Sequence, residues 1–175
     1  MPATAEITPR VPWPCSCRRL AAANPLAARR QGYSAEQLVT VDEANRWIGF
    51  PYPKLMNAHA YIDQSAALVM TSVAVARELG IPPEKWVFLH GCADAADLWN
   101  PLDRQDFHSS PAMRLTGQRA LEMAGIGLET IDLIDLYSCF PVAVEVGAEE
   151  LGLALDDPRG LTVTGGLPYA GGPGN

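Results

Sequence analysis

Two short segments of the sequence carry residue types that could take part in chemistry, and the first is Tyr137-Ser138-Cys139-Phe140-Pro141. It follows an apolar run, and it ends on a proline that is typical of a helix start. Ligands of α/β proteins gather at the carboxyl ends of strands, where the dipole of the next helix stabilises negative charge. The thiol of Cys139 could become a nucleophile there, and the phenol of Tyr137 could act as a hydrogen-bond donor or acid. Both residue types are also common in cores, so packing alone is the alternative for each.

The second segment runs from Gly165 to Asn175 and is rich in glycine. It lacks the Gly-Lys-Ser/Thr ending of a phosphate-binding loop, and it lacks the strand position and acidic residue of a dinucleotide fingerprint. Glycine permits positive φ angles and a close approach by another group. The segment is therefore either a turn-rich connection or a loop that lines a ligand.

The sequence predicts no metal site. Cys15-Ser16-Cys17 is half of a zinc site, but no second pair of Cys or His follows at the required spacing. The histidines have neither metal spacing nor a partnered nucleophile; they are His59, His90 and His108.

The composition excludes several classes of protein. The chain has 175 residues, of which 48% are hydrophobic and 19% charged, and its formal net charge is −7. These values are typical of a globular protein and argue against nucleic-acid binding, which needs clustered Lys and Arg. We find no apolar run long enough for a bilayer and no signal peptide after Met1. The four cysteines of the chain then predict a reduced, cytoplasmic setting without a disulfide framework.

The apolar pattern predicts strands that alternate with helices, which is typical of a layered α/β domain. Short apolar runs predict buried strands, while Ser, Pro and Gly mark the expected starts and ends of helices. The predicted strands are 66–71, 86–90, 131–136 and 161–164, and the helices are 73–79, 111–124 and 141–151, with shorter pieces within 21–30 and from Ala35. We expect residues 1–20 to be irregular, 21–65 to form a loop or linker region, and 66–175 to form the core.

Several motifs, in this order, resemble those of the thiolase superfamily, and in particular its sterol-carrier-protein-type members that act as acetyl-CoA acetyltransferases. The resemblance covers residues 21–175. The segment Met56-Asn57-Ala58 through Ala67 is similar to the Asn-Ala-Ser segment before the first core strand, and Ser109-Ser110-Pro111-Ala112 is similar to a later helix start. Tyr137-Ser138-Cys139-Phe140 stands where thiolases have Asn-Glu-Ala-Phe or His-Asp-Cys-Phe. Gly165 through Pro173 stands where they have a Gly-Gly pair followed by Gly-His-Pro.

The resemblance implies a thiolase-like layered α-β-α fold, of which this chain holds a partial C-terminal core. It also implies a coenzyme A thioester as substrate and no covalently bound cofactor. In that family a Cys of the N-terminal half is acylated, the His of Gly-His-Pro activates it, and a later Cys exchanges a proton. Here the motifs of both cysteines are missing, Gly172 stands at the His position, and Tyr137 replaces the oxyanion residue. We therefore expect a fragment that exposes normally covered apolar surface and is not competent alone.

The resemblance places Tyr137 and Cys139 at the reactive end of the cleft. It implies that the cleft is also lined by Asn57, Phe140, Gly166, Gly171, Gly172 and Pro173.

Three functions remain open for the full-length protein. The first is a thiolase-like acyltransferase of fatty-acid or sterol breakdown, and the second is a related retro-aldolase acting on side-chain CoA esters without a catalytic Cys. The third is a non-catalytic acyl-CoA-binding protein. The resemblance also implies a homodimer, which in some relatives works with a small OB-fold partner.

Overall fold

The computed structural model describes the backbone of residues 13–172 and the side chains of residues 17–172, so Pro173 and the first twelve residues lie outside it. The helices are α1 (Trp13–Ala23), α2 (Ala35–Val39), α3 (Val73–Glu78), α4 (Pro111–Ala124), α5 (Pro141–Leu151) and α6 (Leu167–Ala170). The strands are β1 (Trp47–Gly49) and β2 (Tyr52–Pro53), and short 3-10 turns are η1 (Lys54–Met56), η2 (Pro83–Lys85), η3 (Pro101–Asp103) and η4 (Leu128–Thr130).

Helices α3, α4 and α5 confirm the predicted helices to within a residue or so, because their ends are set locally. The Ser110 hydroxyl accepts a hydrogen bond from the Met113 N–H at the start of α4, and Gly125 ends that helix with a φ of 69°. Ser72 caps α3 in the same way. Side-chain caps and left-handed glycines satisfy the backbone groups that a helix end leaves free, so they are readable from the sequence.

The N-terminal part differs from the prediction. Helix α1 begins at Trp13 and ends at Ala23, whereas we expected an irregular stretch through residue 20 and a short helix within 21–30. Proline is tolerated in the first turn of a helix, so Pro14 does not prevent this early start. Cys17 and Ala21, four residues apart on one helix face, are both buried in the core. That burial, which depends on distant residues, stabilises the helix.

The predicted strands are the main correction. Within residues 13–172 the only sheet is the antiparallel pair β1–β2, with Trp47 opposite Pro53, and none of the segments 66–71, 86–90, 131–136 and 161–164 is a strand. Val69 is 80% exposed and Val87 is 95% exposed, so the first two segments lack the cover on both faces that their apolar sequences require. The last two segments come closest to pairing, through a hydrogen bond of 2.9 Å from the Leu136 N–H to the Leu161 carbonyl.

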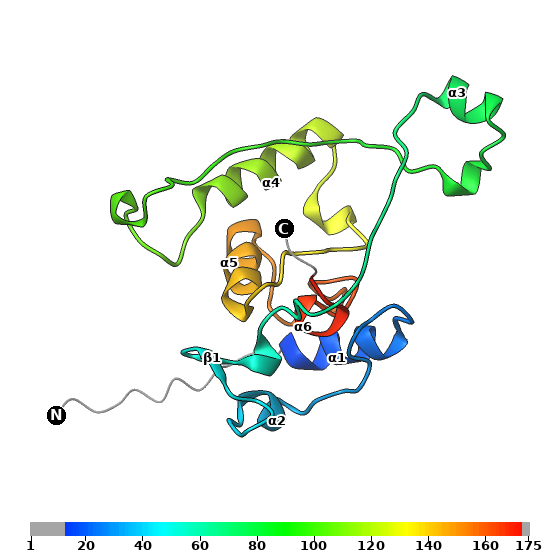
Figure 1. Cartoon of the computed structure of the whole chain (residues 1–175). Helices are drawn as coiled ribbons and strands as arrows, with labels where there is room; N and C mark the ends of the chain where they lie inside the picture. Colours follow the sequence, from blue (N-terminus) through cyan, green and yellow to red (C-terminus); the bar gives the residue numbers. More distant parts are fainter. Residues whose placement is uncertain (1–12, 173–175) are drawn as a thin grey trace.

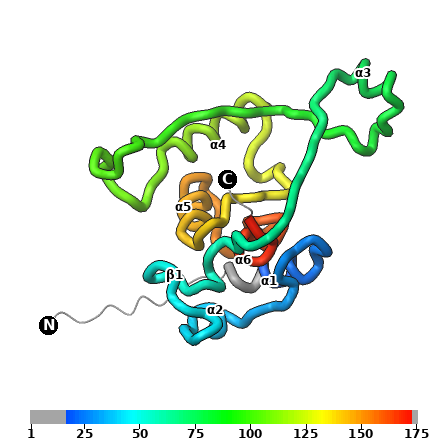
Figure 2. The backbone as a smooth tube through the Cα atoms, in the orientation of Figure 1, coloured from blue at the N-terminus to red at the C-terminus, as the bar shows by residue number. Residues whose placement is uncertain are grey.

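The core joins the two ends of the described chain. Helix α1 contacts α6, and α4 contacts α5 (Figure 1). Figure 2 shows the same arrangement, with α3 on a projecting arm of long connecting segments. The buried cluster includes Cys17, Ala21, Val144, Ala148 and Tyr169. Among the described residues, no helix is long and apolar enough to cross a membrane.

Candidate functional site

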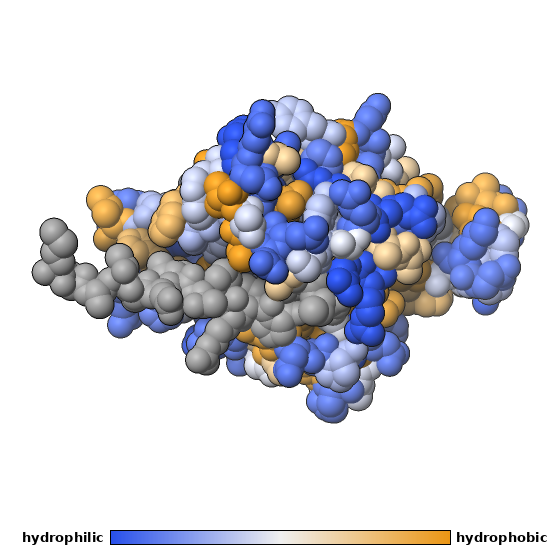
Figure 3. All heavy atoms as spheres, turned by 90° about the horizontal axis from the view of Figure 1, so that it is seen from below, coloured by the Kyte–Doolittle hydropathy of each residue, from blue (hydrophilic) through white to orange (hydrophobic). Residues whose placement is uncertain are grey.

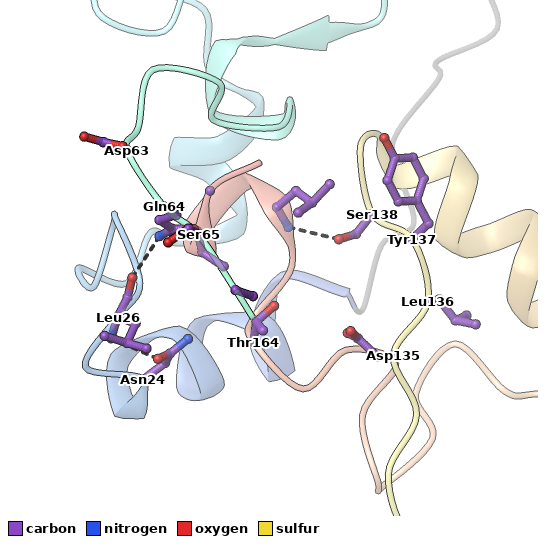
Figure 4. A pocket seen from close by; sticks show the side chains of 14 residues that line it. Asn24, Leu26, Asp63, Gln64, Ser65, Asp135, Leu136, Tyr137, Ser138 and Thr164 are labelled. Carbon is purple, nitrogen blue, oxygen red and sulfur yellow. Dashed lines mark hydrogen bonds between the residues drawn. The ribbon is translucent and has the colours of Figure 1, made fainter. Parts of the chain in front are cut away.

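A pocket of about 800 Å³ lies where four distant segments meet (Figure 4). The segments are the turn after α1, residues 63–66, residues 135–138, and the glycine-rich segment from residue 164 to 171. Its lining residues are Asn24, Leu26, Asp63, Gln64, Ser65, Ala66, Asp135, Leu136, Tyr137, Ser138, Thr164, Leu167, Ala170 and Gly171.

Two of the predicted site residues, Tyr137 and Gly171, line this pocket. The other described ones are not among the lining residues: Asn57, Cys139, Phe140, Gly166 and Gly172. The carbonyl of Cys139 and the N–H of Gly172 nevertheless both bond to the segment that follows Asn57. The two segments that the sequence singled out therefore lie together in the fold.

Tyr137 has the most reactive surroundings of the predicted residues. Its side chain is about half exposed at the pocket wall. Burial of the rest raises the pKa of the phenol above its usual value, and the neighbouring Cys139 raises that pKa further. A phenol of raised pKa stays protonated at neutral pH, so Tyr137 can donate a hydrogen bond but is a poor general base.

Ser138 connects the two site segments directly. It is buried, and its hydroxyl accepts a hydrogen bond of 2.9 Å from the Leu167 N–H, drawn as a dashed line in Figure 4. The sequence analysis assigned no role to Ser138. A small hydroxyl residue at a strand end is the available signal, but its partner lies 29 residues away.

Residues 57–59 form a strut between the same segments. The Ala58 N–H donates to the Cys139 carbonyl at 3.0 Å, and the His59 N–H donates to the Leu167 carbonyl at 3.1 Å. The His59 carbonyl in turn accepts a bond of 3.0 Å from the Gly172 N–H. The buried side chain of Asn57 holds the start of the strut by donating to the Pro53 carbonyl at 2.7 Å. The role of Asn57 in this structure is thus to position the backbone.

The glycine-rich segment needs its glycines for conformation and for space. Gly171 has a φ of 102°, and a Cβ there would stand 2.1 Å from the Ile62 Cδ1 atom. Gly165 has a φ of 97°, and a Cβ there would stand 2.7 Å from the Cβ of Ala21. Both positions confirm the expected positive φ and close approach. Gly171 also lines the pocket, so the ligand-lining interpretation of this segment stays a prediction beside the turn-rich one.

Gln64 is a pocket residue that the sequence analysis missed. Its amide nitrogen donates to the Leu26 carbonyl at 3.0 Å and to the Ala170 carbonyl at 2.8 Å. It therefore joins the turn after α1 to the end of α6 across the pocket (Figure 4). Asp135 has a similar local role, because its carboxylate accepts a bond of 3.1 Å from the Val163 N–H.

The remaining predicted residues lie beside the pocket. Phe140 stacks on Tyr52 with ring centroids 5.7 Å apart, which attaches the β1–β2 hairpin to the start of α5. No disulfide joins the cysteines whose side chains the structure describes, and no group of three or more His, Cys, Asp or Glu residues in that part of the chain could hold a metal ion.

Comparison with known proteins identifies the family. A model of the family described as thiolase C-terminal domain-like matches residues 93–172. An acetyl-CoA acetyltransferase of Schizosaccharomyces pombe is 31% identical over 117 residues, which are 67% of this chain and 27% of that protein. The crystal structure of a monomeric SCP2-thiolase-like protein type 1 from Mycobacterium smegmatis matches with a TM-score of 0.84 and 48% identity, over 93% of this chain and 36% of that one.

This chain thus spans well under half the length of either relative. It belongs to the thiolase superfamily as an SCP2-thiolase-like protein, and the expected partial thiolase-like α/β fold is confirmed.

Proposed function

We propose that this chain belongs to an enzyme that transfers acyl groups to or from coenzyme A, in which Tyr137 donates a hydrogen bond to the thioester oxygen. The observation that carries the proposal is the half-exposed phenol at the wall of the pocket, whose O–H can reach a ligand bound there. Its position in the sequence is the one at which thiolases carry their oxyanion residue. The substrate would be an acyl-CoA thioester, and fatty-acid or sterol breakdown is the setting that the family implies.

The chemistry of Tyr137 follows from where charge develops. Attack on a thioester carbonyl places negative charge on its oxygen, and a donor aimed at that oxygen stabilises the transition state more than the substrate. Loss of one such donor slows catalysis by about a hundredfold to a thousandfold. Cys139 does not line the pocket, and its sulfur beside the phenol would serve to support Tyr137 or as a second reactive group.

Gly172 supports a second candidate, retro-aldol cleavage of a side-chain CoA ester. Glycine has no side chain that could take a proton from a thiol, so the activating His of thiolases has no counterpart at this position. Retro-aldol cleavage needs no thiol. The β-hydroxyl gives its proton to a base and becomes the carbonyl of the released aldehyde or ketone as the carbon–carbon bond breaks. The electrons of that bond form the thioester enolate, whose oxygen Tyr137 could stabilise until a proton returns to its carbon. Binding of acyl-CoA without turnover is the third candidate.

The test compares Tyr137→Phe with Cys139→Ala, each made in this chain and at the matching position of the full-length M. smegmatis relative. Exposed Tyr61, replaced by Phe, is the matched control. The assays are exchange of labelled coenzyme A, release of an aldehyde or ketone, and binding of acyl-CoA by calorimetry. We expect Tyr137→Phe to lower acyl exchange about a hundredfold with little change in binding, and no effect of the Tyr61 variant.

The other outcomes separate the candidates. Unchanged acyl exchange in Tyr137→Phe would refute the proposed role of the phenol. Release of an aldehyde or ketone that depends on Tyr137 but not on Cys139 would establish the retro-aldolase instead. Binding without either product would leave only the non-catalytic candidate.

The assembly and location of the full-length protein stay predictions. The family resemblance implied a homodimer with a possible OB-fold partner, whereas the M. smegmatis relative is described as monomeric. Light scattering on the full-length protein would decide between these states. A cytoplasmic location would be checked by fractionation.

A further inference from the structure

A second pocket, of about 600 Å³, is lined in part by residues of α2 and shares no lining residue with the pocket at Tyr137. Helix α2 lies at the lower edge of Figure 1. We call it the Arg29 pocket. Polar and charged side chains line it, including Arg29, Tyr33, Lys54, Glu36 and Asp42. Figure 3 views the molecule from below, the side on which α2 lies in Figure 1, and shows many hydrophilic side chains on that face.

Arg29 is a half-buried cation whose contacts are uncharged. Its guanidinium donates to the Pro168 carbonyl at 3.2 Å and lies 3.4 Å from the Nδ1 atom of His59. Among residues 17–172, no carboxylate lies within ion-pair distance of Arg29 or Lys54. Burial lowers the pKa of Arg29, as expected for a cation that has lost water without gaining an anion. A partly buried charge is normally paired, so the missing partner points to a ligand.

His59 lies against the Arg29 guanidinium and is not itself a lining residue of this pocket. Burial lowers the pKa of its imidazole below 6.5, and the charges of Arg29 and Lys54 lower it further. Both cations therefore act on the His59 imidazole and disfavour its protonated form. The phenol of Tyr33 adds a hydrogen-bond group to the lining.

The rim of the pocket has the opposite character. Glu36 and Asp42 are exposed, and both line the pocket. They would repel an extended polyanion, yet carboxylates are good acceptors for hydroxyl groups. The pocket thus combines two cations that no carboxylate of the described residues pairs with and two exposed carboxylates.

We propose that the Arg29 pocket binds a small phosphorylated sugar, with its phosphate on Arg29 and Lys54 and its hydroxyls on Glu36 and Asp42. Arginine and lysine are the side chains that proteins use for phosphate, and a carboxylate is a common partner of ribose hydroxyls. The sugar phosphate could be a free metabolite or the ribose phosphate end of a larger cofactor. This site shares no lining residue with the pocket at Tyr137, so its failure would leave the role of Tyr137 untouched.

Calorimetric titration of the chain with ribose 5-phosphate, ribose, inorganic phosphate and coenzyme A tests the proposal. We expect saturable binding of ribose 5-phosphate, weaker binding of inorganic phosphate, and none of ribose. Tighter binding of coenzyme A than of ribose 5-phosphate, lost in the same variants, would identify the larger cofactor as the source.

Arg29→Gln should weaken the binding of ribose 5-phosphate by about tenfold or more, since a hydrogen-bonded charge is lost. Lys54→Gln provides a second variant at an exposed position, should the Arg29 variant fail to fold. Arg46→Gln, at an exposed cation outside the pocket, is the matched control and should have no effect.

The proposal would be overturned by the absence of saturable binding, or by binding that neither variant changes. Equal affinity for phosphate and ribose 5-phosphate would also overturn it, because the acidic rim would then recognise no sugar.

Discussion

Replacement of Glu150 by Ala should destabilise the chain strongly, because this carboxylate holds α5 to the start of α4. Its side chain is only 3% exposed. One oxygen accepts the Ser110 N–H at 2.6 Å, and the other accepts the Arg114 Nε at 2.7 Å. Ser110 is also the cap of α4, so the loss would act on a helix end as well as on the contact between two helices.

The expected magnitude follows from the two partners. A buried N–H left without an acceptor costs about 1–3 kcal/mol, and Ser110 is buried. The Arg114 side chain is 55% exposed and can regain water, so the loss of the ion pair adds about 1 kcal/mol at most. Glu150→Ala should therefore lower the free energy of unfolding by about 2–4 kcal/mol. Glu150→Gln keeps an acceptor for Ser110 and should cost only about 1 kcal/mol.

Urea unfolding followed by circular dichroism measures these differences. The matched control is Glu122→Ala, which removes the surface ion pair of Arg119 and Glu122 on α4, where both side chains are more than 60% exposed. That variant should change the free energy of unfolding by about 0.5 kcal/mol or less. Equal losses of unfolding free energy in Glu150→Ala and Glu122→Ala would refute the argument that burial makes the Glu150 contacts more stabilising.

Three further variants test the packing, the electrostatics and the pocket. Gly165→Ala should lower the urea midpoint, because the φ of Gly165 is 97° and the new Cβ would stand 2.7 Å from a methyl carbon of α1. The control is Gly49→Ala, since a Cβ at Gly49 would have nothing within 4 Å. Arg159 lowers the pKa of Asp157 from 3.8 to about 2. Asp157→Asn should therefore have a lower free energy of unfolding than the parent chain above pH 4, and this difference should vanish as the pH falls toward 2. Gln64→Ala should loosen the pocket, which amide hydrogen exchange at the end of α6 would show as lost protection.

The helices could be predicted because their determinants are close in sequence. Ser110, Pro111 and Gly125 define both ends of α4 within fifteen positions, and the structure uses all three. The strands could not, because a strand is completed by hydrogen bonds to a distant neighbour. The run that includes Val69 has the composition of a buried strand, but it has no partner strand among the described residues and is exposed.

The candidate site was predictable in its location and not in its details. Tyr137 was found because it follows an apolar run and precedes a helix start, which is where α/β proteins hold ligands. Gln64 was not found, since its partners lie 38 and 106 residues away. An amide that bonds to main-chain carbonyls has no sequence signature, because every residue type supplies that acceptor.

The strut at residues 57–59 explains why the two site segments must be treated as one unit. Its backbone bonds to Cys139 on one side and to Leu167 and Gly172 on the other, while Ser138 bonds to Leu167 directly. A shift of the glycine-rich segment would therefore be transmitted to the backbone beside Tyr137 without any change in side-chain chemistry. Since backbone hydrogen bonds carry this coupling, most single side-chain replacements would leave it intact. Gly171 is the exception. Its φ is 102°, and a Cβ there would clash with Ile62, so a replacement of Gly171 would shift the backbone and break the coupling.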